Sequence, residues 1–466
     1  MNSIISLPLW MFVLLMAFAA VMVLDRILMP SVRWYLKRRV NRAIEDINTK
    51  LDIQIRPFQL TRKQALVDQL VFDDHVVKAI REYAKEHDMP SEVAQEKAVK
   101  YANEIAPTFN AYVYFRFGYW LSKRLARLLY RVRVGYFDND QLKQIPANSS
   151  VVFVMNHRSN MDYVLVSFLV AEKTALSYAV GEWARIWPLQ TLIKSMGAFF
   201  VRRNSGNKLY RKVLERYVNL ATRAGVCQAV FPEGGLTRDG VMREPKLGFL
   251  DYMIRDYHPD IDRNVVFVPV GINYDRVLED KSLVRRLDQD ATRRSRWFVL
   301  KTSTKFFLKT LMMDRKKRWR RFGYASVNFG KPIYAQEFFQ ASQKDFGKME
   351  TEERFEFVAD LAESLMQAIK KVVPVLPVAL MSDVVLANQG KWCSELELKS
   401  KAVERMHQLK EKGAPIDISD AACERVLSAA LDMLFGRGFV EMEDNLYRAS
   451  SESISLLEYY ANSINY

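Results

Sequence analysis

A histidine and an aspartate five residues apart are the side chains in this sequence best suited to acid–base chemistry. Residues 156–163 have the sequence NHRSNMDY, and His157 is the only one of the five histidines with an aspartate, Asp162, five positions downstream. A neutral imidazole can take the proton of a hydroxyl group, and a carboxylate on its other nitrogen fixes the tautomer and stabilises the imidazolium that forms. The alternative is a polar turn at the start of a helix, and the pattern is too short to decide between the two.

Three further segments carry the cations, the acid and the glycines that binding of a phosphorylated substrate would need. They are SMGAFFVRRNSGNKLY (195–210) with Arg202 and Arg203, FPEGGLTRDG (231–240) with Glu233, Gly234 and Arg238, and VFVPVGINYDRV (266–277) with Pro269. Lys246 follows the second segment. Arginine can bind a phosphate through two hydrogen bonds, and glycine lets backbone amides approach a substrate closely. Each segment also has a purely structural explanation: a solvated cation pair, a turn, and a strand that is bent or lies at a sheet edge.

Several other chemistries lack their usual parts. The sequence has no G-x-S-x-G nucleophile elbow, no G-x-x-x-x-G-K-[ST] phosphate loop and no H-E-x-x-H metal helix. The three cysteines, Cys227, Cys393 and Cys423, are far apart and form no C-x-x-C pair, which favours a reducing compartment. We therefore expect neither a metal site nor hydrolysis through an acyl-serine.

Alternating apolar strands and helices from residue 146 onward are expected to position these side chains. The pattern predicts buried strands at 151–155, 227–231 and 265–272, a helix over 162–172 and one more strand within 326–333. This alternation is typical of an α/β fold with a mostly parallel sheet flanked by helices. His157 and Glu233 come one or two residues after a strand, and in such sheets ligands bind beyond the carboxyl ends of the strands.

The N-terminal residues predict a membrane helix. Residues 4–24 carry no charge, and as a helix they would span about 31 Å, the thickness of a bilayer core. A cleaved signal peptide and an interfacial segment are the alternatives, although no Lys or Arg precedes the apolar run. Basic residues follow immediately from Arg26 to Arg42, so the body of the protein is expected on the cytoplasmic face.

The rest of the chain is predicted to be helical and is rich in positive charge. Lys and Arg number 69 against 54 Asp and Glu, an excess of 15 that suits nucleic acid, an anionic membrane or phosphorylated substrates. Residues 110–134 and 297–321 mix aromatic and basic side chains, as membrane-surface helices do, but an ordinary packed helix is equally open for 110–134. We expect a membrane anchor (1–30), a helical N-terminal region with the interfacial helix (31–145), an α/β domain (146–335) and a helical C-terminal region (336–466).

In this order and spacing, the four segments resemble the glycerolipid acyltransferase superfamily, most closely its bacterial glycerol-3-phosphate 1-O-acyltransferase branch. The four blocks of that family would be His157 with Asp162; Gly197, Phe200 and Arg203; Phe231, Glu233, Gly234 and Arg238; and Pro269. The stretches MDYVLVSFLV, GNKLY, PKLG and LLEYYANSI also look like this branch. The resemblance covers residues 150–335 and the C-terminal tail.

The resemblance implies a membrane-bound enzyme at the cytoplasmic face of the bacterial inner membrane, in contact with anionic lipids. It would transfer a fatty acyl group from acyl-CoA or acyl carrier protein to the sn-1 hydroxyl of glycerol 3-phosphate, giving lysophosphatidate, the first step of phospholipid synthesis. His157 would act as the base and Asp162 as its orienting partner, without metal or cofactor. The residues expected at the substrate are Arg202, Arg203, Glu233, Gly234, Arg238 and Lys246, with Glu233 orienting its loop.

One departure from the family pattern keeps the acceptor open. The third block usually carries an arginine where this chain has Leu236, and a serine where it has Thr237. A lysophospholipid or dihydroxyacetone phosphate is therefore an alternative acceptor. A membrane-tethered basic binding protein is a further alternative, but it leaves the four blocks unexplained. Because the aromatic and basic stretches suit a membrane surface at least as well, we expect no nucleic-acid partner.

Overall fold

The computed structural model describes residues 56–134, 144–171, 174–181, 185, 189–202, 205–258, 261–287, 321–342, 349–416, 418 and 420–465, together with residues 8, 9, 11 and 16. Contacts group Ile55–Tyr466 into one compact unit, separate from Met1–Gln54. The membrane helix expected over 4–24 and the basic stretch 297–320 lie outside the described residues, apart from the four positions named above. Among the helices that the structure describes, none combines the length and the apolar character needed to cross a bilayer.

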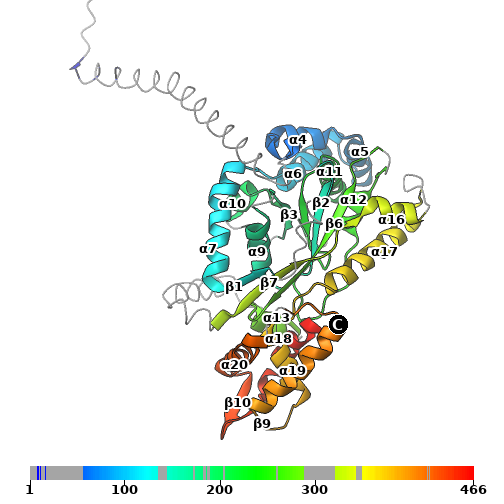
Figure 1. Ribbon diagram of the computed structural model, residues 1–466. Coiled ribbons are helices and arrows are strands. Elements are labelled where there is room, and N and C mark those ends of the chain that lie inside the picture. Colours follow the sequence, from blue (N-terminus) through cyan, green and yellow to red (C-terminus); the bar gives the residue numbers. More distant parts are fainter. Residues whose placement is uncertain are drawn as a thin grey trace, which may run out of the picture. The chain divides into compact units, whose positions relative to one another are not determined.

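A mostly parallel sheet forms the centre of the molecule, as predicted (Figure 1). Its strand order is β1-β7-β6-β2-β5-β3-β4, and β8 also pairs with β6. Strands β6, β2, β5, β3 and β4 run parallel, whereas β7 and β8 are antiparallel to β6. The strands are β1 (Arg131–Val134), β2 (Ser150–Met155), β3 (Ser177–Val180), β4 (Phe199–Phe200), β5 (Gln228–Val230), β6 (Val265–Tyr274), β7 (Tyr324–Phe329) and β8 (Ile333–Tyr334).

Helices cover both faces of this sheet because β2 is apolar on both faces. Val152 and Val154 join the core beneath α11 (Lys208–Arg223), α12 (Gly248–Ile254) and α17 (Thr351–Lys370). The same core includes the N-terminal helices α4 (Lys63–Val71), α5 (Asp74–Glu86) and α6 (Ser91–Ile105). Figure 1 shows α9 (Met161–Val170) and α7 (Tyr119–Leu129) on the other side of the sheet.

The stretch expected to be one helix over 110–134 is interrupted. It begins with a π-helical turn, η2 (Val113–Gly118), continues as α7 and ends as strand β1 at the sheet edge. The expectation of helix over the last four residues is therefore wrong. The alternating Arg and Val of this segment (RVRV) fit a half-buried edge strand, which pairs in parallel with β7.

Pro269 lies inside the sheet, although a proline would more commonly occupy an edge. On one side it pairs with Val154 of β2. On the other side β8 pairs as far as Phe267 and β7 begins at Val270, and the N–H of Gly330 between them donates to the Pro269 carbonyl at 2.8 Å. The N–H and C=O of a strand residue point to the same side, so the N–H that proline lacks would have faced the gap between β8 and β7. No hydrogen bond of the sheet is therefore lost at Pro269.

The C-terminal region is mostly helical, with a small sheet that the sequence pattern did not predict. Its helices are α18 (Pro377–Ala387), α19 (Glu395–Glu411), α20 (Asp420–Gly436) and α21 (Ile454–Ala461), and α18 packs against the other three. Strands β10 (Val440–Glu443), β11 (Leu446–Ala449) and β9 (Cys393–Ser394) form the antiparallel sheet.

Candidate active site

Strand β2 and helix α9 bring His157 and Asp162 together at the carboxyl edge of the sheet. Nδ1 of His157 lies 2.9 Å from Oδ2 of Asp162, and the two residues are only 2% and 0% exposed. Because a carboxylate accepts hydrogen bonds, Nδ1 carries the proton and Nε2 is left as the basic nitrogen. The imidazole stacks on the ring of Phe231, with centroids 4.0 Å apart. A general base needs a hydrogen bond of this kind between Nδ1 and a carboxylate, because it leaves Nε2 available to accept a proton.

Asp162 accepts hydrogen bonds from three further donors. The backbone N–H groups of Arg158 and Ser159 donate to Oδ2 at 2.8 and 3.0 Å, and the hydroxyl of Tyr274 donates to Oδ1 at 2.7 Å. These donors occupy both carboxylate oxygens and fix the plane of the carboxylate. Burial, followed by the charge of Asp162, raises the pKa of Tyr274 well above its usual range, so the phenol keeps its proton. Sequence reasoning missed Tyr274, although it ends the proline-bearing strand β6.

Glu233 connects the His157 loop to the loop after β5. It is 1% exposed, and it accepts hydrogen bonds from the backbone N–H of His157 (2.8 Å) and of Arg243 (2.9 Å). Burial raises its pKa, and the two N–H donors oppose this shift. With both oxygens occupied by backbone donors, Glu233 positions the two loops.

Glu279 is a half-buried acid that also holds the His157 loop, and no sequence pattern pointed to it. It accepts hydrogen bonds from the hydroxyl of Ser159 (2.8 Å) and from the backbone and side-chain amides of Asn160 (3.3 and 3.0 Å). Burial raises its pKa, and the Ser159 and Asn160 donors lower it. Residues of the NHRSNMD segment therefore donate hydrogen bonds to two acids from distant parts of the chain, Glu233 and Glu279.

The C-terminal tail contacts the same loop. The guanidinium of Arg158 stacks over Tyr459 at 4.7 Å and donates to the carbonyl oxygen of Gly240 at 2.8 Å. A Cβ on Gly240, whose φ is +88°, would lie 2.0 Å from the carbonyl oxygen of Tyr459. Tyr460 also donates to Asp280 at 2.5 Å, next to Glu279. Tyr459 thus packs directly behind the loop that carries His157, and Tyr460 holds the neighbouring 277–280 segment.

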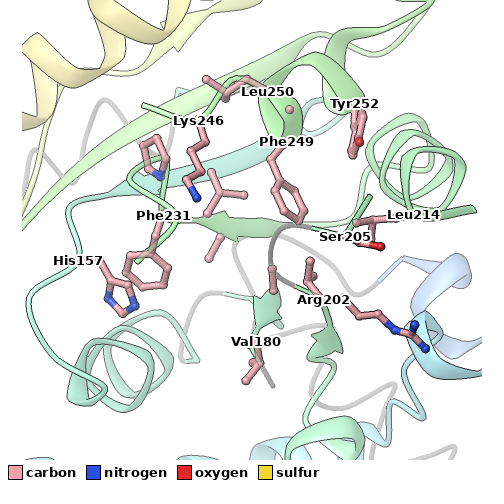
Figure 2. A pocket seen from close by; sticks show the side chains of 18 of the residues that line it. His157, Val180, Arg202, Ser205, Leu214, Phe231, Lys246, Phe249, Leu250 and Tyr252 are labelled. Atoms are coloured by element: carbon pink, nitrogen blue, oxygen red, sulfur yellow. The ribbon is translucent and has the colours of Figure 1, made fainter. Parts of the chain in front are cut away.

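A largely apolar cavity of about 400 Å³ opens beside the imidazole (Figure 2). Its apolar walls come from β3, β4 and β5 and their following loops, from α11 and from α12: Val180, Val201, Leu214, Ala229, Val230, Phe231, Phe249 and Leu250. Lys246, Arg202, Arg211 and Gly234 also line it. The cavity combines space for an apolar chain with a few cations, as expected for an amphipathic anion.

The predicted cations occupy different environments. Arg202 forms two hydrogen bonds with Glu104 (2.9 and 2.6 Å) and lies between Tyr101 and Tyr210, and Figure 2 shows its side chain extending away from His157. The hydrogen bond to Glu104 raises the pKa of Arg202. Arg238 is exposed and is not among the residues that line the cavity. Arg203 lies outside the described residues.

Lys246 is the cation that points toward Phe231 and His157 in Figure 2. No acceptor among the described residues lies within hydrogen-bonding distance of its ammonium group. Its stem crosses Gly234, where φ is +64° and a Cβ would lie 2.7 Å from Cδ of Lys246. Gly234 is therefore required both for its backbone conformation and for this close approach. Arg211, near the start of α11, is a further exposed cation on the cavity that sequence reasoning missed.

No group of three or more metal-ligating side chains (His, Cys, Asp or Glu) gathers at one point within the part of the chain that the structure describes. Leu236, the departure from the family pattern, is half-buried. Thr237 is buried, and its N–H donates to the carbonyl of His157 at 3.1 Å. The segment 231–240 therefore supports the catalytic loop through this backbone contact, independently of the missing arginine.

Comparisons with known proteins find acyltransferases over the part of the chain that forms this site. Residues 137–273 match the family model for acyltransferases, and residues 307–465 match the model for the C-terminal region of glycerol-3-phosphate acyltransferases. A glycerol-3-phosphate acyltransferase of Alteromonas mediterranea is 29% identical over 421 residues, covering 87% of this chain and 49% of that protein. Proteins of the same name from Pseudomonas syringae pv. tomato and Pseudomonas aeruginosa are 30% and 32% identical, over 75% and 66% of this chain and 41% and 36% of theirs.

The chain thus spans half or less of the length of these relatives. Within that span, the two matched regions contain the His157–Asp162 pair, the Glu233 loop and the C-terminal tail that packs behind them. With these two regions and these relatives, the chain belongs to the glycerol-3-phosphate acyltransferase family.

Proposed function

We propose that this chain transfers a fatty acyl group from a thioester to the sn-1 hydroxyl of glycerol 3-phosphate, giving lysophosphatidate. The observation that carries the proposal is the buried His157–Asp162 pair beside an apolar cavity that Lys246 also lines. Acyl transfer to a phosphorylated alcohol needs a base, an apolar site for the chain and a cation for the phosphate, and all three meet here.

The reaction follows from the position of the base. Nε2 of His157 takes the proton of the acceptor hydroxyl as its oxygen attacks the thioester carbonyl. Asp162 stabilises the imidazolium that forms. The tetrahedral intermediate collapses by breaking the C–S bond, and the imidazolium returns its proton to the departing thiolate. Because a thiolate is a good leaving group, the step requires neither an acyl-enzyme nor a metal or other cofactor.

The substrates would be held by opposite kinds of side chain. The cavity walls, such as Val201, Leu214 and Phe249, suit the acyl chain. Lys246 and Arg211 suit the phosphate, because both are exposed cations on the same cavity. The donor would be acyl-CoA or acyl carrier protein, and the enzyme would act at the cytoplasmic face of a bacterial inner membrane, among anionic lipids.

One alternative is a different acceptor for the same reaction. Two observations favour it: Glu104 already binds the Arg202 guanidinium, and Leu236 stands where the family usually has an arginine for the phosphate. Dihydroxyacetone phosphate or a lysophospholipid would use the same base. Competition between acceptors therefore belongs in the same experiment as the activity itself.

The test is an acyl-transfer assay with purified protein, both donors, and glycerol 3-phosphate offered beside its two competitors. We expect labelled lysophosphatidate as the main product, and a loss of about 10²–10⁴-fold on His157→Ala. His258→Ala, at an exposed histidine, is the matched control and should keep wild-type turnover. Preferred acylation of a competitor would contradict glycerol 3-phosphate as the acceptor. Equal turnover of the two histidine variants would contradict His157 as the base.

A further inference from the structure

A long basic segment free of acids runs through η2 and α7. Residues 106–137 contain six Lys and Arg, and no Asp or Glu. The chain as a whole has 54 Asp and Glu in 466 residues, so 32 consecutive positions would be expected to include between three and four of them. The charged side chains of this segment are therefore all positive, and they would attract an anionic partner.

One face of η2 and α7 is buried and packs against the rest of the protein. Buried positions recur every three or four residues and form one stripe: Ala111, Tyr114, Gly118, Ser122, Ala126 and Leu129. The hydroxyl of Tyr114 accepts a hydrogen bond from the backbone N–H of Leu176 at 3.1 Å, and α7 packs along α9. Gly118 is so close to Met196 that a Cβ would lie 2.8 Å from the methionine methyl carbon.

The outer face has aromatic rings that this packing does not use. Tyr112, Phe117 and Trp120 are 48%, 46% and 52% exposed. Phe117 and Trp120 are in contact, with centroids 6.4 Å apart. Arg116 and Arg124 are exposed on the same stripe, and Arg124 lies 5.6 Å from the centroid of Trp120. We refer to these five residues as the aromatic–arginine face.

We propose that the aromatic–arginine face binds the headgroup region of an anionic bilayer. Aromatic rings partition to the level of the headgroups, and arginines beside them reach lipid phosphates while their stems stay on apolar surface. Protein interfaces are also rich in aromatic and arginine side chains, but the 32 acid-free positions around these rings favour an extended anionic surface over a protein partner. The proposal goes beyond the acyl-transfer function and does not depend on which acceptor is used.

The buried cysteines make a direct test possible in the full-length chain. Cys227, Cys393 and Cys423 are 2%, 2% and 7% exposed, so a thiol-reactive fluorophore would label an added surface cysteine selectively. Trp120→Cys places a polarity-sensitive label on the aromatic–arginine face. Phe72→Cys is the matched control, because Phe72 is a 69% exposed aromatic residue followed by Asp73 and Asp74.

The labelled proteins are reconstituted in vesicles of phosphatidylcholine with increasing phosphatidylglycerol. We expect the label at position 120, and not at position 72, to move into an apolar environment as the anionic fraction rises, and to be quenched by lipids brominated near the headgroup. A label at 120 that stays in water at every composition would overturn the proposal. So would a label that lies in an apolar environment at every composition yet is not quenched by the brominated lipids, since another segment or a second copy would then cover the face.

Charge reversal tests the electrostatic part independently of catalysis. Arg116→Glu with Arg124→Glu should lower the docked-to-undocked ratio of a label at Phe117→Cys by at least about 30-fold, because each basic side chain near an anionic surface contributes roughly fivefold. Lys78→Glu with Arg81→Glu makes the same charge change on exposed positions of α5 and should change the ratio less than about twofold. Equal effects of the two pairs would mean that only net charge matters, which contradicts a defined docking face.

Discussion

The hydroxyl of Tyr274 donates a 2.7 Å hydrogen bond to Oδ1 of Asp162 from a position 112 residues further along the chain. Asp162 in turn holds His157, so a strand end on one side of the site fixes the base on the other. The NHRSNMDY segment is therefore only part of the machinery, and the residues that orient it come from β6, the Glu279 segment and the C-terminal tail.

Removing this hydroxyl should impair catalysis more than folding. Tyr274→Phe takes one of four donors from a buried carboxylate, and a hydrogen bond to a charged group contributes about 1.5–3 kcal/mol. We expect kcat to fall roughly tenfold or more, while the KM of the acceptor changes little. Tyr130→Phe is the matched control, because Tyr130 is equally buried and its ring packs against that of Tyr274, but its hydroxyl donates to the Arg276 carbonyl. Steady-state kinetics of both variants decide the question, and equal losses would argue against a role through Asp162.

Lys246 should contribute more to acceptor binding than Arg238. Lys246 lines the cavity beside His157 and has no acceptor among the described residues, whereas Arg238 is exposed and is not part of that lining. Lys246→Met should raise the KM of a phosphorylated acceptor at least about tenfold and leave the KM of the acyl donor nearly unchanged, since one charge-assisted contact is lost. Arg238→Met should change either KM less than about threefold. The reverse ranking would place the phosphate at Arg238.

The contact between Gly240 and Tyr459 should transmit changes in the tail to the catalytic loop. Gly240→Ala forces a Cβ onto the Tyr459 carbonyl and should displace Arg158, with a large loss of kcat. Gly390→Ala is the matched control: its φ of +82° imposes similar backbone strain, but nothing lies within 4 Å of the added Cβ. Both variants should lose roughly 1–2 kcal/mol of unfolding free energy through backbone strain, and Gly240→Ala should lose more because its Cβ also overlaps the Tyr459 carbonyl. If both kept wild-type kcat, the tail would be structurally separate from the site.

The raised pKa of Asp275 should make the unfolding free energy depend on pH. Burial raises the pKa of this carboxyl from its ordinary value of 3.8 to about 6, against hydrogen bonds from the N–H groups of Tyr324 and Val378. The folded state then binds the proton more tightly than the unfolded chain, so unfolding free energy falls as pH rises from about 4 to about 6. The expected decrease is about 3 kcal/mol, from roughly two pKa units at 1.36 kcal/mol each.

Denaturant unfolding at several pH values checks this prediction. Asp275→Asn should be less stable overall, because an amide nitrogen faces one of two backbone donors, but its stability should depend less on pH across the same interval. A wild-type curve that rises with pH between 4 and 6 would contradict the assignment to Asp275.

The central strands were predictable because their apolar runs are buried on both faces. The run 151–155 covers β2 except for Ser150, 227–231 covers all of β5, and 265–272 covers most of β6. The residues just past the first two runs include His157 and Glu233. Strand β1 and the small C-terminal sheet were missed. Their four-residue segments, such as RVRV, carry too little pattern to distinguish a strand from the end of a helix.

The residues that support the site could not be found by spacing. Tyr274, Glu279 and Tyr459 lie 112, 120 and 301 residues from the side chains they contact. Arg202 shows the opposite difficulty: it belongs to a segment suited to phosphate binding, yet Glu104 and two tyrosine rings occupy its guanidinium. A local pattern identifies which side chains can act, but the partners that occupy them depend on tertiary packing.

The position of Tyr459 behind the catalytic loop has a consequence for biosynthesis. Arg158 and Tyr459 are 301 residues apart, so a ribosome adding about 5–20 residues per second needs roughly 15–60 s between them. During that interval the chain has its base and its acid but not the tail that holds their loop. A nascent chain should therefore stay inactive until residue 459 has emerged from the ribosome.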